Sequence, residues 1–334
     1  MRNWCVMAAT CLATTGAVAQ TAQIAAPSVG FVVDPQTRSI RPIAGQPGAA
    51  LLGKPLSLDV AVQIARFPSA PAWSLAVAAD RERRPVVIQG LTSMPGVQDL
   101  GGAIGDIDFV ALGENGSAAI ASLKSRQMQF LSGLPATPLL SAPVDLSLVP
   151  GDLISICIRS DGTAALVAAT DGTSGGIYEV TQADGSVQLI AMSQRPTAAT
   201  YLNESRDLAF ADAALNELIL ISDIHGGRNR AVLAGPVDDV AGPIAVQLTD
   251  KGLAVANAGS RNIIQYDLSA GQITGDIPLP VVPEILDPLT THGVFVVNRV
   301  GSDPLYLYSA GQSKVWFVPR PLEKQSAATN SEKQ

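Results

Sequence analysis

One stretch of the chain decides the fold: Leu253-Ala254-Val255-Ala256-Asn257-Ala258-Gly259-Ser260-Arg261-Asn262-Ile263-Ile264-Gln265-Tyr266-Asp267. It contains two short apolar segments joined by a polar turn. A glycine turn at Ala270-Gly271 follows, and then a third segment, Ile277-Pro278-Leu279-Pro280. Short apolar runs bounded by Gly, Pro, Asn and Asp are typical of β-strands. The stretch therefore predicts three consecutive strands joined by tight turns.

The same order of strands and turns recurs along the chain. It is visible upstream over residues 208–233 and downstream over residues 294–318. A polar turn precedes the second strand of each unit, and these turns begin at Gly30, Pro71, Gly116, Gly162, Asp207, Gly252 and Gly293. Their spacings are 41, 45, 46, 45, 45 and 41 residues. A period of about 40 to 45 residues with four short strands per unit is the signature of a β-propeller blade.

Each unit is predicted to contain four strands, named A to D in chain order, with the polar turn between A and B. The A strands are expected at residues 61–66, 106–112, 153–158, 198–202, 243–248 and 285–289. Residues 31–52 supply strands B and C of a further blade, and its A strand would come from residues 21–28. We predict an all-β propeller of four antiparallel strands per blade, with seven blades as the first choice and six as the alternative.

Two local features are interpreted from this repeat. Residues 164–169 are rich in alanine and favour a helix on propensity alone, but their place in the repeat predicts a strand. An unpaired edge strand at the end of the ring would be exposed. We therefore expect the N-terminal stretch to complete a blade beside the last one.

Residues 1–19 have the pattern of a secretory signal peptide. Arg2 supplies the charged start, residues 4–13 are apolar, and Ala17-Val18-Ala19 forms a small-residue cleavage site. We expect cleavage after Ala19, a single propeller domain over residues 20–320 and a disordered polar tail over residues 321–334. The expected location is the periplasm or the secreted fraction. The sequence after residue 19 contains no run of about 18 apolar residues, so no transmembrane helix is predicted.

Composition and charge narrow the class of protein. Apolar residues make up 47% of the 334 residues and charged residues 15%, so the chain can bury a sizeable core. The net charge of −7 becomes −8 when Arg2 leaves with the signal, and nucleic-acid binding is not expected of so acidic a chain. Only Cys157 remains after cleavage. It lies in the apolar run 153–158, which predicts a buried core thiol and no internal disulfide.

The unit over residues 253–280 resembles the repeat of the YVTN-type propellers, which are exported and surface proteins of bacteria and archaea. The resemblance lies in Val255-Ala256-Asn257, in the strand Ile263–Asp267 and in Ile277-Pro278-Leu279. The units that begin at Asp207 and Gly293 match this pattern loosely, and the first four have Asp or Ser where the pattern has Asn. The resemblance implies a propeller and an exported location, and it carries no catalytic residues.

Side chains that could carry catalysis are sparse. The mature chain has two histidines, His225 after a C strand and His292 at an A–B turn, and both are interpreted as surface turn residues. No Cys pair, His-x-x-x-His or calcium-loop pattern occurs, so no metal site and no cofactor is predicted. The glycine-rich segments 171–176 and 225–230 lack Gly-Lys-Ser/Thr and open no predicted helix. We interpret them as hairpin turns rather than phosphate-binding loops.

Basic residues gather in one class of loop. All B–C loops of a propeller emerge on one face, and here they hold Arg38, Arg81, Arg83, Arg84, Lys124, Arg126, Arg261 and Arg299. These loops carry a net charge of +1 on a mature chain of −8, with the positive charge concentrated in blades 6, 7, 1, 2 and 3. We hypothesise that this arc binds an anionic or carbonyl-rich partner, such as a polysaccharide, a peptidoglycan fragment or an acidic peptide, through arginine forks. The alternative interpretation is a set of solvated turn residues.

These observations predict an exported, non-enzymatic propeller that serves as a binding or scaffold module for an extracytoplasmic protein, peptide or polysaccharide. The alternative is a hydrolase or lactonase acting on a small ester or sugar derivative at the central mouth, where acids, Asn and His would converge, with calcium held by oxygen ligands. A quinone-dependent dehydrogenase is a third option. It would need a stacking aromatic side chain at the axis, whereas Trp73 and Trp316 fall in B or outer strands.

Overall fold

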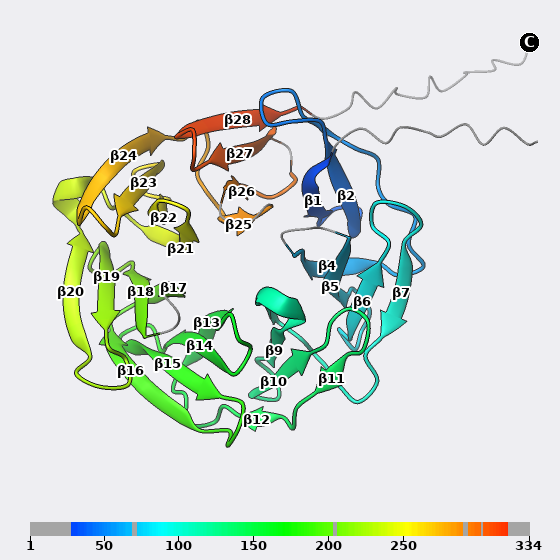
Figure 1. Cartoon of the computed structure of the whole chain (residues 1–334), viewed down its shortest axis with the longest axis horizontal. Coiled ribbons are helices and arrows are strands. Elements are labelled where there is room, and N and C mark those ends of the chain that lie inside the picture. Colours follow the sequence, from blue (N-terminus) through cyan, green and yellow to red (C-terminus); the bar gives the residue numbers. More distant parts are fainter. Residues whose placement is uncertain (1–27, 69–71, 203–205, 290–292, 302, 320–334) are drawn as a thin grey trace, which may run out of the picture.

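The computed structural model describes residues 28–68, 72–202, 206–289, 293–301 and 303–319. Their strands form seven antiparallel sheets arranged in a ring around a central axis (Figure 1). The protein is thus a seven-bladed β-propeller, which decides between the two blade numbers considered from the sequence. The helices among these residues are two 3-10 turns, Glu114–Gly116 and Pro236–Asp238. Within the described part of the chain, no helix has the length and apolarity needed to cross a membrane.

The blades follow the chain order, and each strand pairs with the next from the axis outward. The strands of blades 1 to 3 are β1 (Ser28–Asp34), β2 (Ser39–Ala44), β3 (Leu51–Leu52); β4 (Val62–Arg66), β5 (Trp73–Ala78), β6 (Pro85–Gln89), β7 (Gly96–Asp99); and β8 (Phe109–Leu112), β9 (Ala118–Ser122), β10 (Gln127–Ser132), β11 (Leu139–Leu140), β12 (Val144–Asp145). In blade 3 the outer position is shared by β11 and β12, which both pair with β10.

The remaining four blades have four strands each. They are β13 (Asp152–Ile158), β14 (Ala164–Thr170), β15 (Gly175–Thr181), β16 (Val187–Ser193); β17 (Pro196–Leu202), β18 (Asp207–Asp212), β19 (Glu217–Ser222), β20 (Asn229–Ala234); β21 (Pro243–Thr249), β22 (Gly252–Asn257), β23 (Asn262–Asp267), β24 (Gln272–Pro278); and β25 (Asp287–Pro288), β26 (Val294–Val296), β27 (Leu305–Ser309), β28 (Lys314–Val318). The six A strands expected from the repeat are β4, β8, β13, β17, β21 and β25.

The second strand of a blade is the most buried one. All seven residues of β14 are buried, although four of them are alanines. A strand in this position packs against neighbouring sheets on both of its faces, so its pattern is a continuous apolar run rather than an alternation. Small side chains let the adjacent sheets approach, and the alanine-rich segment therefore forms a strand, as its place in the repeat predicts.

Blade 1 lies beside blade 7 and closes the ring (Figure 1). Val32 and Leu52 of blade 1 belong to the same apolar cluster as Leu305 and Val318 of blade 7. The N–H of Leu52 also donates to the carbonyl of Pro319, at 3.4 Å. The N-terminal stretch thus contributes a blade beside the last one, as expected. Three strands of blade 1 lie within the described residues, and the expected A strand over 21–28 lies outside them except for Ser28, which begins β1.

The alternating strand directions assign the loops to two faces. The B–C loops and the D–A loops, which join one blade to the next, emerge together on one face. We call it the B–C face. Its loops touch each other, since Arg83 of a B–C loop bonds to Asp108 of the next D–A loop. The A–B and C–D loops emerge on the opposite face.

A recurrent turn shapes the B–C loops. In blades 1, 3, 4 and 5 the last residue of strand B is a buried polar residue that accepts hydrogen bonds from turn amides, as Asp212 Oδ1 does from the N–H groups of Ala214, at 2.8 Å, and Leu215, at 3.2 Å. In blades 1, 3 and 6 strand C is preceded by a residue with a left-handed backbone, with φ of 50° at Arg38, 53° at Arg126 and 54° at Arg261. This backbone is uncommon for residues other than Gly, Asn and Asp. The repeat thus places arginine at the same position of several blades.

Candidate functional site

The eight basic residues predicted to bind a partner all lie in B–C loops of the structure. They come from the loops β1–β2, β5–β6, β9–β10, β22–β23 and β26–β27. Their side chains divide into two sets of four. One set is held by other residues of the chain, and the other makes no ion pair or side-chain hydrogen bond with the described residues.

Two members of the held set belong to blade 2. Arg83 Nη1 donates to Asp108 Oδ1 at 2.7 Å, and Arg84 Nη2 donates to Asp80 Oδ2 at 2.9 Å. Burial alone would raise the pKa of Asp80, but the hydrogen bonds from the Arg84 side chain and from the Arg83 amide lower it overall. Asp80 therefore stays ionised and fixes the β5–β6 turn.

The other two held residues belong to blade 3. Lys124 Nζ lies 2.7 Å from Asp106 Oδ2. The guanidinium of Arg126 donates to the carbonyls of Gly151, at 2.6 Å, Leu146, at 3.2 Å, and Val149. These carbonyls lie on the segment that leads from blade 3 into β13, so Arg126 ties two blades together rather than offering its charge to a partner.

The second set consists of side chains without a partner among the described residues: Arg38, Arg81, Arg261 and Arg299. They lie on blades 1, 2, 6 and 7, which are consecutive around the ring. The charge count made from B–C loops alone omitted the D–A loops of the same face, which supply Asp106 and Asp108 to the held residues. The basic side chains without a partner among the described residues therefore lie on blades 1, 2, 6 and 7, and binding of a partner by all eight residues stays a prediction.

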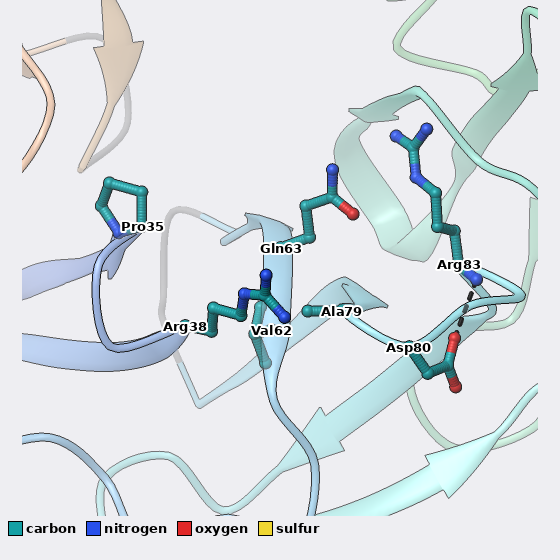
Figure 2. Close-up of a pocket in the computed structure, with 7 residues that line it drawn as sticks. All are labelled: Pro35, Arg38, Val62, Gln63, Ala79, Asp80 and Arg83. Atoms are coloured by element: carbon teal, nitrogen blue, oxygen red, sulfur yellow. Dashed lines mark hydrogen bonds between the residues drawn. The ribbon is translucent and has the colours of Figure 1, made fainter.

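A pocket lies on the B–C face between blades 1 and 2. It has a volume of about 390 Å³, and its walls are Pro35, Arg38, Val62, Gln63, Ala79, Asp80 and Arg83. Figure 2 shows Arg38 reaching from the β1–β2 loop and Gln63 rising from β4, with Arg83 at the far side. Arg83 Nε is buried and has no hydrogen-bond partner. Two of the predicted basic residues thus share one concave site.

A second group of polar side chains joins blades 4 and 5 on the opposite face. Glu179 of β15 is 3% exposed, and its Oε1 accepts the hydroxyl of Tyr201 at 2.9 Å. Its Oε2 lies 2.7 Å from Nε2 of His225, and Arg159 Nη1 lies 3.9 Å from Oε1. Burial, and then the Glu179 carboxylate, raise the pKa of Tyr201, so its hydroxyl stays protonated as the donor. The interpretation of His225 as a surface turn residue did not include its contact with this buried carboxylate.

The structure also shows the surroundings of the free cysteine and of the two tryptophans considered from the sequence. Cys157 is a free thiol that packs against the cluster containing Ile177 and Phe210, and burial raises its pKa. Trp73 begins β5 and Trp316 lies in the outermost strand β28. No three His, Cys, Asp or Glu residues in the described part of the chain are grouped so that they could hold a metal ion. His292 lies outside the described residues.

Comparison with known proteins shows similarity in fold. No protein-family model matches the sequence, and no curated protein matches it. Similar solved structures include a protein from Lactobacillus plantarum (TM-score 0.62, 16% identity, 87% of this chain and 95% of that one). They also include a catalytically inactive variant of virginiamycin B lyase from Staphylococcus aureus with quinupristin (TM-score 0.56, 11% identity, 78% of this chain and 84% of that one). A chain of the nidogen/laminin complex is similar as well (TM-score 0.52, 11% identity, 75% of this chain and 92% of that one). At these identities the similarity supports the propeller fold alone.

Proposed function

We propose that this propeller is an exported, non-enzymatic binding module that holds an acidic segment of an extracytoplasmic protein on its B–C face. One observation carries the proposal: Arg38, Arg81, Arg261 and Arg299 lie on four consecutive blades with no partner in the described chain. An arginine retained without an internal partner keeps all five of its N–H donors for a ligand. Charges spread over four blades suit an extended polyanionic segment better than one small molecule.

A protein partner is favoured over a polysaccharide by the lining of the pocket. Its apolar walls are Pro35, Val62 and Ala79, and no aromatic side chain is among the lining residues. Sugar rings commonly pack their C–H faces against the electron-rich faces of aromatic rings. One of the similar folds comes from a complex of nidogen with laminin, which supports the use of this architecture as a protein-binding scaffold.

Binding to defined polyanions tests the proposal. A variant with Arg38→Gln, Arg81→Gln, Arg261→Gln and Arg299→Gln is compared with the parent for affinity to an oligo-glutamate peptide, an oligo-lysine peptide and a polyuronate. Because exposed ion pairs each contribute about 0.2–1 kcal/mol, the four changes together should weaken oligo-glutamate binding about fourfold or more. Arg206→Gln is the control, since Arg206 is exposed on the opposite face and has no side-chain partner among the described residues.

The result has clear alternatives. Oligo-glutamate should bind more weakly as salt rises, because salt screens exposed charges. Equal affinity of the parent and the fourfold variant would overturn the proposal. Preference for the polyuronate, with the same arginine dependence, would replace the protein partner by a polysaccharide.

The exported location and the YVTN-type identity of blade 6 are part of the proposal. Asn257, the asparagine of the motif, is fully buried, and its Nδ2 donates to Asn262 Oδ1 at 3.0 Å. The motif thus acts in the B–C turn, which agrees with a structural repeat without catalytic residues. Mass spectrometry of the extracytoplasmic fraction should find a chain that begins at Gln20. A full-length chain confined to the cytoplasm would contradict the export proposal.

A hydrolytic function is the second candidate, favoured by the Glu179–His225 pair. A carboxylate that holds one ring nitrogen of a histidine leaves the other nitrogen to act as a general base. His225 is half-exposed, so water and an ester could reach it. This pair lies on the C–D side between blades 4 and 5 rather than at the central mouth. Hydrolysis of a small aryl ester that is lost in His225→Gln would support this candidate.

A further inference from the structure

The pocket between blades 1 and 2 contains more hydrogen-bond donors than its own acceptors use. The guanidinium of Arg38 and the carboxamide of Gln63 have no partner among the described residues, and Arg83 uses Nη1 on Asp108, at 2.7 Å, while its buried Nε has none. A buried donor without an acceptor costs free energy. Among these donors Arg83 Nε bears this cost, whereas Arg38 and Gln63 are exposed and offer their donors to a ligand that supplies acceptor oxygens.

The one carboxylate in the lining, that of Asp80, is already occupied. Asp80 Oδ1 accepts the N–H groups of Glu82, at 3.1 Å, and Arg83, at 2.8 Å, and its Oδ2 accepts Arg84 Nη2 at 2.9 Å. The carbonyl of Arg38 accepts the N–H of Val62 at 2.7 Å. The pocket is therefore suited to a hydrogen-bond acceptor and not to a cation.

The backbone around Arg38 is fixed before any ligand arrives. Asp34 Oδ1 accepts the N–H groups of Gln36, at 2.9 Å, and Thr37, at 3.2 Å, and the carbonyl of Arg38 is bonded to β4. Arg38 itself has the left-handed backbone of the recurrent turn. The loop thus needs no reordering on binding, which lowers the entropic cost of recognition.

The charge of the lining favours a monoanion. Two arginines and one aspartate line the pocket, and the charges of Arg83 and Asp80 are already opposed by Asp108 and Arg84. The charge of Arg38 is the one in this lining that has no counterpart among the described residues. A planar carboxylate fits the planar fork of a guanidinium with two parallel hydrogen bonds, whereas a phosphate dianion would bring excess negative charge near Asp80.

We propose that this pocket is a subsite for one carboxylate group, which Arg38 holds through its guanidinium and Gln63 through its amide N–H, while Pro35 and Ala79 contact the adjoining methylenes. The inference rests on the proposed function and sharpens it. The subsite takes an acidic side chain of the bound protein segment, and the other free arginines contact the rest of that segment.

Nuclear magnetic resonance titration with small probes tests the subsite. The probes are N-acetyl-glutamate amide, its neutral isostere N-acetyl-glutamine amide, and inorganic phosphate. The glutamate probe should shift the side-chain amide signal of Gln63 and the backbone signal of Val62, and the glutamine probe should shift neither. Arg38→Asn should weaken glutamate binding about tenfold or more, because asparagine tolerates the left-handed backbone but lacks the guanidinium.

Matched variants complete the test. Arg206→Asn removes the same charge from an exposed side chain on the opposite face, outside the proposed binding residues, and it should leave the affinity for the probe unchanged. Gln63→Glu places a like charge beside the ligand and should abolish binding, and its own fold is checked by its thermal transition. Equal shifts with the glutamine probe, tighter binding of phosphate, or unchanged affinity in Arg38→Asn would each overturn the carboxylate assignment.

The subsite and the proposed function can fail separately. If oligo-glutamate binds through the free arginines but the small probe leaves Gln63 and Val62 unshifted, the subsite is wrong and the binding module stands. If the small probe binds at Arg38 but the affinity for oligo-glutamate does not change when Arg261 and Arg299 are replaced, the subsite stands and the proposal of an extended acidic partner is wrong.

Discussion

Arg66 and Asp287 form an ion pair of 2.9 Å between residues 221 positions apart in the sequence. Arg66 ends β4, the innermost strand of blade 2, and Asp287 begins β25, the innermost strand of blade 7. Blade 1 lies between these two blades in the ring (Figure 1). The pair therefore joins the two neighbours of the closing blade, where the apolar cluster shared by blades 1 and 7 also lies.

Removing this pair should loosen ring closure modestly. Both side chains are about one-third exposed, at 38% and 33%, so solvent screens the interaction. Arg66→Gln and Asp287→Asn, combined in a double-mutant cycle, should give a coupling energy of about 0.2–1 kcal/mol in urea unfolding. The control cycle uses Arg230 and Glu217, a pair of 3.0 Å within blade 5. Faster amide exchange in β1 should follow loss of the first pair and not of the second.

Arg126 is expected to be a structural residue despite its place in the predicted binding arc. Arg126→Gln leaves the carbonyls of Gly151, Leu146 and Val149 without their charged donor, which should lower the free energy of unfolding by about 1.5–3 kcal/mol. Lys124→Gln removes only an exposed ion pair and should cost under about 1 kcal/mol. Chemical denaturation of the two variants measures the difference. Similar costs for both would contradict the assignment of Arg126.

Asp212 should make stability sensitive to acid. Burial alone would raise its pKa, but hydrogen bonds from the Ser193 hydroxyl, at 2.6 Å, and from turn amides, including that of Gln194 at 2.9 Å, lower the pKa below 3.8 overall. A carboxyl whose pKa is lower in the folded state stabilises the fold above its unfolded pKa, and this stability is lost as the pH falls below about 4.

Unfolding of Asp212→Asn across the acid range checks this prediction. The variant should be less stable than the parent at neutral pH by about 1–3 kcal/mol, because the turn amides lose a charged acceptor. The gap should close as the pH falls below about 4. A gap that stays constant down to low pH would show that the carboxylate charge is not the source of the stability.

Overpacking of a B strand should reveal how closely the blades approach. Ala168 in β14 is 1% exposed and packs in the cluster that joins blades 4 and 5. Ala168→Leu should destabilise the protein by about 1–3 kcal/mol, because the adjacent sheet leaves no room for the added methylenes. Ala231→Leu on the exposed outer strand β20 is the matched control and should change stability little. Equal thermal transitions for the two variants would argue against close packing at β14.

Much of the fold follows from the sequence because the repeat restricts every local choice. The period placed six A strands within three residues of their observed bounds, and it overrode the helix propensity of residues 164–169. It could not show which arginines are free. The partners of Arg83 and Lys124, Asp108 and Asp106, come from D–A loops, which share a face with the B–C loops only once the strands alternate around the ring.

The Glu179–His225 contact could have been predicted from the separation of the two residues in the sequence. The two residues are 46 positions apart, which is one blade period, and Gln265 and Ala310 are bonded at a separation of 45. In both pairs a residue of strand C contacts the C–D loop of the next blade, since Glu179 and Gln265 lie in β15 and β23 while His225 and Ala310 follow β19 and β27. A search of the sequence for complementary polar residues at that separation would have found the pair. The orientation of each side chain still depends on packing that the period does not encode.

The turn that presents Arg38 has a practical consequence for protein engineering. Its shape is set by the Asp34 carboxylate and by a main-chain bond to Val62, and neither involves the guanidinium. Position 38 can therefore be randomised without disturbing the scaffold, provided that the new residue accepts the backbone geometry. A library varied at positions 38, 81, 261 and 299 would turn this ring into a source of synthetic affinity reagents.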